Sequence, residues 1–364
     1  MEITNLKLLN FRNFDKLDLN FSKNKNIIIG NNGVGKTNIV ESIFVLALTK
    51  SFRTNEDELL VNENSDFYKI EGTIKSNFVN NYKIIYQEKN KVVKINNNKI
   101  NKFSDYISNI NVILFSINDL KLIKDTPSTR RKLINLEISQ LNNDYITYLN
   151  YYNKILKQRN TYLKSLYNKV INYDYLDIID NQLIDYGIKI YEIRNEFIIK
   201  INDILSKIYI SLGGFEGLYI NYKNDYMNKS LEDIKKDYKN NVNKDISLGS
   251  TQIGIHRDDF IFSMNNKDIK NFASEGQQKN AIIAFKLSEL NLFFEIKKEY
   301  PILILDDLFS ELDLKKIENI LNYLSENIQT FITTTDLKKI KKKYLKNSKI
   351  FKINDKCIEE EIYE

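Results

Sequence analysis

The stretch "NIIIGNNGVGKTNIVESIFVLAL", residues 26–48, decides the fold of this chain. Its apolar run Ile27–Ile29 predicts a buried strand, and residues 30–37 match the pattern GxxxxGK[ST] without a gap. A helix is predicted next, and its expected buried stripe consists of Ile39, Ile43, Leu46 and Ala47. A strand, a glycine-rich loop and a helix in this order predict the phosphate-binding loop (P-loop) of an α/β protein.

The residue types of this loop match the chemistry of a nucleoside triphosphate. Glycines let backbone N–H groups turn around phosphate oxygens, where a Cβ would intrude. Lys36 is expected between the β- and γ-phosphates, and the Thr37 hydroxyl is expected to ligate Mg²⁺. The sequence has no Asn-Lys-x-Asp motif that would select guanine, which favours ATP over GTP. The predicted ATP-binding residues are Gly30, Asn31, Asn32, Gly33, Val34, Gly35, Lys36 and Thr37.

A second half-site is predicted in "YPILILDDLFSELD", residues 300–313. Ile302–Leu305 is typical of a central parallel strand that is buried on both faces. Asp306, at the carboxyl end of this strand, is expected to hold Mg²⁺ through water, and Asp307 is expected to face the γ-phosphate. An Asp pair after a strand also occurs by chance, but together with the P-loop it predicts catalytic roles for Lys36, Asp306 and Asp307.

A third segment, "NFASEGQQKNAIIAFKLSEL" at residues 271–290, raises the question of what its polar end contacts. Ser274 and Gln277 have the spacing of a capping box, so a helix is predicted to begin there. The free N–H groups and the dipole of the first helical turn would suit a phosphate. The alternative is an ordinary solvated helix cap.

Composition limits the class of protein. The chain has 364 residues, of which 42% are hydrophobic and 28% charged, which is typical of a soluble globular protein with room for two lobes. One cysteine, Cys357, excludes an internal disulfide framework and favours a reducing cytoplasm. The polar start "MEITNLKLLN" and the lack of a long apolar run predict no signal peptide and no membrane partner. The net charge of +6 only weakly indicates a polyanionic partner.

The order of these motifs is that of ABC-type ATPase heads. Within that order Ser274, Gly276 and Gln277 resemble the signature motif, and Ser310 and Asp313 resemble the D-loop. Five further motifs together resemble the RecF family of bacterial recombination mediators. They are FRNF (11–14), KSFRT (50–54), LFSINDLKLIKDTPSTRRKLIN (114–135), GIHRDD (254–259) and ASEGQQK (273–279).

The resemblance implies an SMC-like ATPase head without the long coiled coil. Its expected fold is α/β, with a β-rich lobe (residues 67–100), a parallel sheet and an inserted helical lobe. It also implies ATP-driven dimerisation, duplex and gapped DNA as ligands, and work with RecO and RecR to load RecA. Ser274 and Gly276 of one copy would then contact the ATP held by the other copy.

Further residues are interpreted through this resemblance. Arg12 is expected either to approach the γ-phosphate or to be a surface arginine. Most ABC heads carry Glu where this chain has Asp307, and Thr333–Thr335 contains no histidine, so a slow ATPase used as a timer is expected. His256 lacks the Cys or His partners of a metal site, so a structural or interface role near the nucleotide lobe is favoured.

Between the two half-sites, apolar and tyrosine residues at heptad spacing predict a short antiparallel helical hairpin joined near Asn172. The first seam consists of Leu141, Tyr145, Tyr148, Tyr152, Ile155, Arg159, Tyr162 and Leu166. The second consists of Leu176, Ile179, Leu183, Tyr186, Ile190, Ile193 and Phe197. The tyrosines are expected to be packing residues rather than a base-stacking platform. The predicted domains are residues 1–123, 124–245 and 246–364.

DNA contacts are the least determined part of the prediction. The candidates are Arg130, Arg131 and Lys132, and Lys341 within the basic run 338–343. A charge run can also be a plain solvated face.

Two alternative functions remain open. The nucleotide-binding subunit of a transporter would have a shorter insertion and a switch histidine, and a small-molecule kinase would not need the signature and D-loop pair.

Overall fold

The computed structural model describes residues 1–166, 170–324, 326–354 and 357–363. The chain forms two compact units. Unit 1 consists of Met1–Lys121, Ile210–Gly214 and Lys279–Glu364, and unit 2 consists of Leu122–Tyr209 and Phe215–Gln278. Unit 2 is thus an insertion in the sequence of unit 1, as expected for the helical lobe.

Unit 1 contains a six-stranded sheet in the order β15-β14-β3-β13-β12-β8. Five of these strands are parallel, and only β15 pairs antiparallel, with β14. The strands are β3 (Lys25–Ile29), β8 (Val112–Ser116), β12 (Ile302–Asp306), β13 (Thr330–Thr334), β14 (Ser348–Asn354) and β15 (Cys357–Tyr363). The strands predicted at Ile27–Ile29 and Ile302–Leu305 are confirmed, and β12 is buried along its whole length.

The second sheet of unit 1 is antiparallel and has the order β2-β1-β4-β5-β6-β7. Its strands are β1 (Glu2–Phe11), β2 (Phe14–Asn20), β4 (Phe67–Lys75), β5 (Val79–Gln87), β6 (Asn90–Ile95) and β7 (Asn98–Ile100). Strand β4 alternates buried and partly exposed residues, as one covered sheet face requires. This sheet includes the β-rich segment predicted at residues 67–100.

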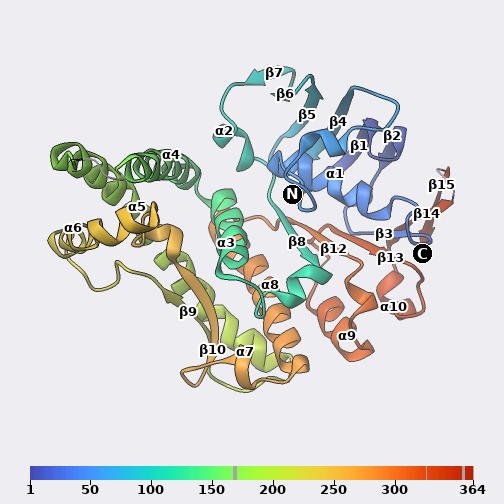
Figure 1. Cartoon of the computed structure of the whole chain (residues 1–364). Coiled ribbons are helices and arrows are strands. Elements are labelled where there is room, and N and C mark those ends of the chain that lie inside the picture. Colours follow the sequence, from blue (N-terminus) through green and yellow to red (C-terminus); the bar gives the residue numbers. More distant parts are fainter. Residues whose placement is uncertain (167–169, 325, 355–356, 364) are drawn as a thin grey trace. The chain divides into compact units, whose positions relative to one another are not determined.

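Helix α1 (Lys36–Leu48) contacts strands of both sheets (Figure 1). Because it is covered from two sides, every residue from Ile39 to Leu48 is buried, rather than only the single stripe predicted from sequence. The remaining helical elements of unit 1 are η1 (Asp57–Leu60), α2 (Ser104–Ile107), η2 (Ile117–Lys121), η4 (Leu308–Ser310), α9 (Leu314–Tyr323) and α10 (Lys342–Leu345).

Unit 2 is largely helical and holds one small sheet, in the order β11-β10-β9. Its elements are α3 (Pro127–Leu141), α4 (Asn143–Ser165), α5 (Tyr173–Ser211), β9 (Leu218–Lys223), α6 (Leu231–Leu248), η3 (Ile255–Arg257), β10 (Asp259–Met264), β11 (Lys267–Asp268) and α7 (Ile269–Phe272). Side chains cap α4 and α6 where these helices begin. Asn142 Oδ1 accepts from Tyr145 N–H, and Ser230 and Asp233 form a capping box. Helix α8 (Glu275–Lys297) starts in unit 2 and continues into unit 1.

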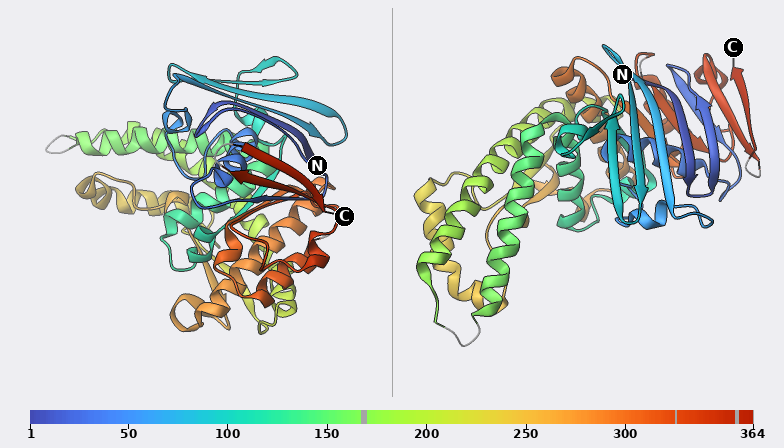
Figure 2. Two further views of the ribbon diagram at one scale, coloured as in Figure 1. Left: turned by 90° about the vertical axis from the view of Figure 1, so that its right-hand side faces the viewer. Right: turned by 90° about the horizontal axis from the view of Figure 1, so that it is seen from above.

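The predicted hairpin is present as α4 and α5, which lie side by side (Figure 2). Tyr148 and Tyr162 of α4 make ring contacts with Tyr186 and Tyr175 of α5. Most seam residues are buried, as the heptad spacing predicts, although Leu141 is the last residue of α3. The joint partly falls on residues 167–169, which lie outside the described residues.

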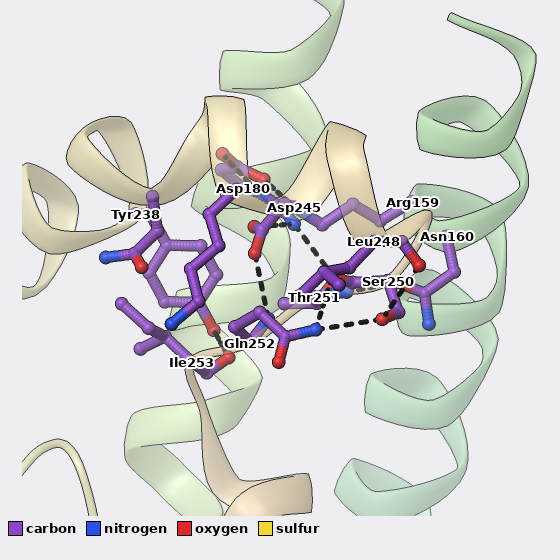
Figure 3. Close-up of polar contacts among 12 residues, drawn as sticks. Arg159, Asn160, Asp180, Tyr238, Asp245, Leu248, Ser250, Thr251, Gln252 and Ile253 are labelled. Carbon is purple, nitrogen blue, oxygen red and sulfur yellow. Dashed lines mark hydrogen bonds and ion pairs between the residues drawn. The ribbon is translucent and has the colours of Figure 1, made fainter. Parts of the chain in front are cut away.

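Arg159, which interrupts the first seam, joins three helices (Figure 3). Its Nε donates to Oδ1 of Asp180 on α5 at 2.5 Å, and its Nη1 donates to Oδ2 of Asp245 on α6 at 2.6 Å. The same Nη1 also donates to the Thr251 hydroxyl at 2.9 Å. The Arg159 side chain is completely buried, so a charged residue occupies a seam position because two carboxylates lie opposite it.

The insertion is larger than its predicted limits of 124 and 245. The compact units divide the chain after Lys121 and after Gln278, apart from a short return at Ile210–Gly214. The physical reason for the later division is strand pairing. Strand β10 pairs with β9 over six residues, and this draws the GIHRDD segment into unit 2.

Candidate nucleotide-binding site

The loop between β3 and α1 has a backbone path that requires glycine. Gly33 and Gly35 have φ values of 88° and 108°, in the left-handed region that other residues rarely adopt. A Cβ on Gly35 would lie 2.6 Å from the Asn13 amide nitrogen, and one on Gly30 would lie 2.7 Å from the Ile353 carbonyl oxygen. The exposed residues of the loop are Asn31, Asn32 and Gly33. The loop therefore has the tight turn and the open rim that a phosphate chain needs.

Lys36 extends from the first turn of α1 over this loop. Its Nζ donates to the carbonyl oxygens of Gly30 and Asn31, both at 2.8 Å. Burial lowers the pKa of Lys36, whereas the charges of Asp307 and Asp306 act to raise it. The ammonium is thus held between loop carbonyls and within range of two carboxylates, which is the position that charge-assisted binding of phosphate oxygens requires.

Thr37 and Asp306 come together from distant parts of the sequence. Thr37 Oγ1 donates to Asp306 Oδ1 at 3.0 Å, and Thr333 Oγ1 of β13 donates to the same oxygen at 2.8 Å. Burial raises the pKa of Asp306, and both hydroxyl donors oppose that rise. Among the described residues no group of three or more His, Cys, Asp or Glu side chains could hold a metal. A hydroxyl beside one carboxylate nevertheless fits Mg²⁺, which commonly takes its other ligands from water and phosphates.

Asp307 differs from Asp306 in backbone and environment. It follows the end of β12 with a left-handed φ of 50°, and its N–H donates to Thr333 Oγ1 at 2.8 Å. Burial raises the pKa of Asp307, while the charge of Lys36 lowers it. A carboxyl group of raised pKa at the open end of the strand is suited to accept a proton from water.

Arg12, which is partly buried, and the buried Glu41 form an ion pair beside the P-loop that was not predicted from the sequence. Glu41, on α1, is fully buried and accepts from Arg12 Nε at 2.9 Å and from Arg12 Nη2 at 2.7 Å. The Ser51 hydroxyl also donates to Glu41, at 2.5 Å. Arg12 is therefore engaged with α1 instead of being a free surface arginine. A single Glu inside the apolar run of α1 was the signal available in the sequence.

The FRNF and KSFRT motifs meet at the P-loop through asparagine side chains. Asn38 Nδ2 donates to Asn13 Oδ1 at 2.8 Å, and Asn13 Nδ2 donates to the Val34 carbonyl oxygen at 3.2 Å. Arg53 Nη1 donates to Asn38 Oδ1 at 2.8 Å, and its charge lowers the pKa of Asp306. Arg53 was not among the predicted site residues, yet it is a half-exposed cation next to them.

The predicted D-loop follows Asp307 directly. The Ser310 hydroxyl donates to the Asp307 carbonyl oxygen at 2.7 Å. Asp313 caps the N-terminus of α9 by accepting from Lys316 N–H at 2.9 Å. Both Ser310 and Asp313 are exposed, so this turn is available to a partner.

The predicted capping box at the start of α8 is confirmed. Ser274 N–H donates to Gln277 Oε1 at 2.8 Å, and Gln277 N–H donates to Ser274 Oγ at 3.3 Å. Ser274 is exposed, and a Cβ on Gly276 would meet only Ser274 Oγ, at 3.9 Å. The motif lies in unit 2 and presents an uncrowded helix N-terminus.

The predicted DNA-contact residues differ in accessibility. Arg130 is buried, and its guanidinium binds Asp259 at 2.7 and 2.9 Å, so it is corrected from a surface cation to a structural one. Arg131 is partly buried and donates to the Asp258 carbonyl oxygen at 2.6 Å. Lys132 and Lys341 are both exposed. Lys341 Nζ lies 2.6 Å from Glu318 Oε1.

His256 is partly buried in unit 2. Its Nδ1 lies 2.7 Å from the Tyr152 hydroxyl, and its Nε2 lies 3.0 Å from the Thr251 carbonyl oxygen. Burial lowers the pKa of His256 to about 4, so the ring is neutral at pH 7. These contacts agree with the expected structural role.

No helix in the described parts of the chain is long and apolar enough to cross a membrane.

A family model described as "RecF/RecN/SMC N terminal domain" matches residues 2–359. The chain is 38% identical to the DNA replication and repair protein RecF of Lactobacillus johnsonii, over 97% of this chain and 98% of that protein. It is 40% identical to the RecF proteins of Streptococcus agalactiae and Clostridium botulinum, with 98% of each chain covered.

Solved structures agree with these sequence matches. A structure described as the recombination mediator RecF with ATP in the RecFOR pathway superposes with a TM-score of 0.91 at 32% identity, covering 99% of this chain and 97% of that one. An SMC head domain bound to part of ScpA superposes with a TM-score of 0.56 at 15% identity and 98% coverage of that chain. The predicted fold, an ABC-type ATPase head with a helical insertion, is confirmed.

Proposed function

Because the chain belongs to the RecF family, we propose that it is a recombination mediator that binds DNA and dimerises when ATP is bound. The observation that carries the proposal is the contact of Thr37 with Asp306 beside Lys36, in a chain that matches RecF proteins over nearly its whole length. Because these relatives match over nearly their full length, they favour this function over that of a transporter subunit or a small-molecule kinase.

The P-loop residues fit ATP and Mg²⁺. The glycine-dependent turn leaves space for a phosphate chain, and Lys36 supplies a fixed cation at its rim. Thr37 and Asp306 offer a hydroxyl and a carboxylate as neighbouring oxygen ligands. When bound, Mg²⁺ neutralises charge that develops on the β- and γ-phosphate oxygens. Asp307 would orient the attacking water and accept its proton, helped by its raised pKa.

A second copy of the chain would complete each site. Ser274 and Gly276 lie at an exposed, capped helix N-terminus, which can bind a γ-phosphate from the side opposite the P-loop. Ser310 and Asp313 would line the same interface from the D-loop. Two-fold symmetry then gives two equivalent composite sites.

Slow hydrolysis is the expected kinetic behaviour. Asp307 is one methylene shorter than the Glu of most ABC heads, and its carbonyl and N–H groups are both bonded within the site. The segment after β13 has threonines and no histidine. ATP hydrolysis would therefore act as a timer that releases the dimer from DNA, and we propose that DNA stimulates it weakly.

The DNA ligand is proposed to be duplex that borders a single-strand gap, bound without sequence preference. Arg131, Lys132 and Lys341 are the remaining candidates for phosphate contacts, and lysine and arginine contacts to phosphates carry no base information. RecO and RecR are proposed as partners and RecA as the protein loaded, because the solved relatives are described as parts of the RecFOR pathway.

ATP-dependent retention on DNA tests this function. The wild-type protein, with Mg²⁺ and ATP, ADP or no nucleotide, is passed over immobilised linear duplex with or without a single-stranded gap. Retention is expected only with ATP, and it should be strongest on gapped DNA when cognate RecO and RecR are added. Equal retention with ADP would contradict the proposal, because the nucleotide would then not control DNA binding.

A further inference from the structure

Three successive carbonyl groups of the D-loop accept hydrogen bonds from lysine side chains. Lys339 Nζ donates to the carbonyl oxygens of Phe309 at 2.8 Å and Ser310 at 3.0 Å. Lys279 Nζ donates to the carbonyl oxygen of Glu311 at 3.0 Å and lies 3.6 Å from its carboxylate. Hydrogen bonds from an ammonium group are roughly twice as strong as neutral ones. Two cations therefore hold this short segment of unit 1.

The two lysines come from the segments that the nucleotide site uses. Lys279 is on α8, five residues after Ser274. Lys339 follows β13, in a turn where Thr334 Oγ1 donates to the Asp336 carbonyl oxygen at 2.9 Å and Asp336 Oδ1 accepts from Lys338 N–H at 2.7 Å. These hydrogen bonds fix the backbone around Lys339, whose side chain binds the D-loop.

A continuous series of hydrogen bonds connects the candidate Mg²⁺ ligand with the same segment. Thr333 Oγ1 donates to Asp306 Oδ1 and accepts from Asp307 N–H. The Asp307 carbonyl oxygen accepts from the Ser310 hydroxyl, and the Ser310 carbonyl oxygen accepts from Lys339. These hydrogen bonds link Asp306 to the exposed D-loop within unit 1.

From these contacts we propose that Lys279 and Lys339 are positioning residues that fix the D-loop for its contact with a second copy of the chain. They hold Ser310 in place and connect the signature helix, the D-loop and the segment after β13. Lys339 also keeps Asp307 in its catalytic position through Ser310. This inference rests on the proposed function, because it assumes that ATP closes a dimer over the D-loop.

Substitution of Lys339 separates this role from nucleotide binding. Lys339→Met keeps the side-chain length and removes the charge, and Lys339→Arg keeps the charge. Lys346 is an exposed lysine of the same C-terminal segment, so Lys346→Met is the matched control. In Lys339→Met we expect the Kd for ATP to stay within about twofold. The dimer Kd with ATP should rise about tenfold or more and kcat should fall about tenfold, the scale of charged hydrogen bonds.

Lys279→Met should change the dimer Kd in the same direction, and Lys339→Arg should restore most of the loss. Rescue by Lys339→Arg is a readout that general loss of folding would not give, and Lys346→Met should leave the dimer Kd and kcat at their wild-type values.

The outcomes distinguish this inference from the proposed function. Wild-type dimer Kd and kcat in Lys339→Met would overturn the positioning role and leave the proposed function intact. A wild-type protein that stays monomeric with ATP, Mg²⁺ and DNA would overturn the proposed function, and the positioning role with it.

Discussion

Asp306 and Asp307 are neighbours in sequence, yet their surroundings suit them to different proposed roles. Asp306 is buried at the end of β12 and accepts two hydroxyl hydrogen bonds on one oxygen. Asp307 has a left-handed backbone and is held by its main chain, so its carboxylate makes no such bonds to hydroxyls among the described residues. Environments that separate two carboxylates in this way favour a metal ligand and a base, respectively.

Asp307→Asn tests the second of these tasks. The amide has nearly the same shape and keeps the backbone bond to Thr333, but it cannot accept a proton. We expect kcat to fall by about 10²-fold or more, the scale of a lost general base. ATP affinity and ATP-dependent DNA retention should remain. Hydrolysis at the wild-type rate would remove Asp307 from this role, and Asp66→Asn, on the exposed surface, serves as the control.

His256→Asn tests the role of the partly buried ring through the pH dependence of stability. Because burial lowers the pKa of His256 to about 4 from about 6.5 in the unfolded chain, unfolding takes up a proton between these values. The neutral ring makes its full contribution to the free energy of unfolding above pH 6.5, and this contribution is lost as pH falls towards 4. We subtract the free energy of unfolding of the variant from that of the wild type. As pH falls from 6.5 towards 4, this difference should decrease by at most about 1.4 kcal/mol per pH unit.

Urea titrations of both proteins at several pH values between 4 and 8 give this difference. Burial also raises the pKa of the neighbouring Asp258 carboxyl to about 6. Because both proteins retain this carboxyl, its contribution is expected to cancel in the difference. A difference that is constant from pH 4.5 to 7.5 would contradict a lowered pKa of His256.

At the scale of elements, helices α4, α5 and α6 are joined by one charged residue. Arg159→Leu would leave Asp180 and Asp245 buried without their cation, and breaking such a group costs about 3–5 kcal/mol. We expect a loss of this size in the free energy of unfolding, measured in urea at pH 7. Lys189→Met removes the exposed Lys189–Asp185 pair and should cost less than about 0.5 kcal/mol.

A second measurement checks that the cost arises from unpaired carboxylates. Burial raises the pKa of Asp180 and Arg159 lowers it, so without Arg159 the Asp180 carboxyl should protonate more readily. The deficit of Arg159→Leu should therefore shrink as pH falls from 7 to 5. An unchanged deficit across this range would indicate that lost packing, and not charge, is the cause.

Local sequence patterns were enough to predict several elements but not the contacts between distant ones. The P-loop strand, β12, the hairpin and the α8 capping box follow from spacing within about 20 residues. Arg159 instead depends on carboxylates 21 and 86 positions away, and the limit of unit 2 depends on the β9–β10 pairing. Arg130 was misassigned because its burial against Asp259 is equally remote in sequence.

The site residues show the same division. Lys36, Thr37 and Asp306 were predicted because their types and spacing match a chemistry that tolerates few substitutes. Glu41 and Arg53 were missed because their role is to support the P-loop through Arg12 and Asn38, and several residue types could do so. Supporting residues become visible only when their hydrogen bonds are known.

At the scale of the whole molecule, the proposed activity depends on two copies of the chain. Ser274→Arg would place a long side chain at the start of α8, where it would block the close approach of the partner's phosphates. Nucleotide affinity should stay within about threefold of the wild type, because the P-loop is unchanged. ATP-dependent dimers should disappear in sedimentation at micromolar protein concentration, and normal dimers in this variant would contradict the shared site.

DNA binding should show the salt dependence of phosphate contacts. With Z phosphates neutralised, log K falls with log salt at a slope of about −0.9Z and is independent of base sequence. The exposed cations Lys132 and Lys341 are available for such contacts, whereas Arg130 is not. Lys132→Gln and Lys341→Gln should each reduce the slope by about one and weaken all sequences alike. Lys189→Gln, at a partly exposed site away from these residues in sequence, is the control. An affinity that does not change between 50 and 200 mM salt would mean that contacts other than phosphate contacts hold the DNA.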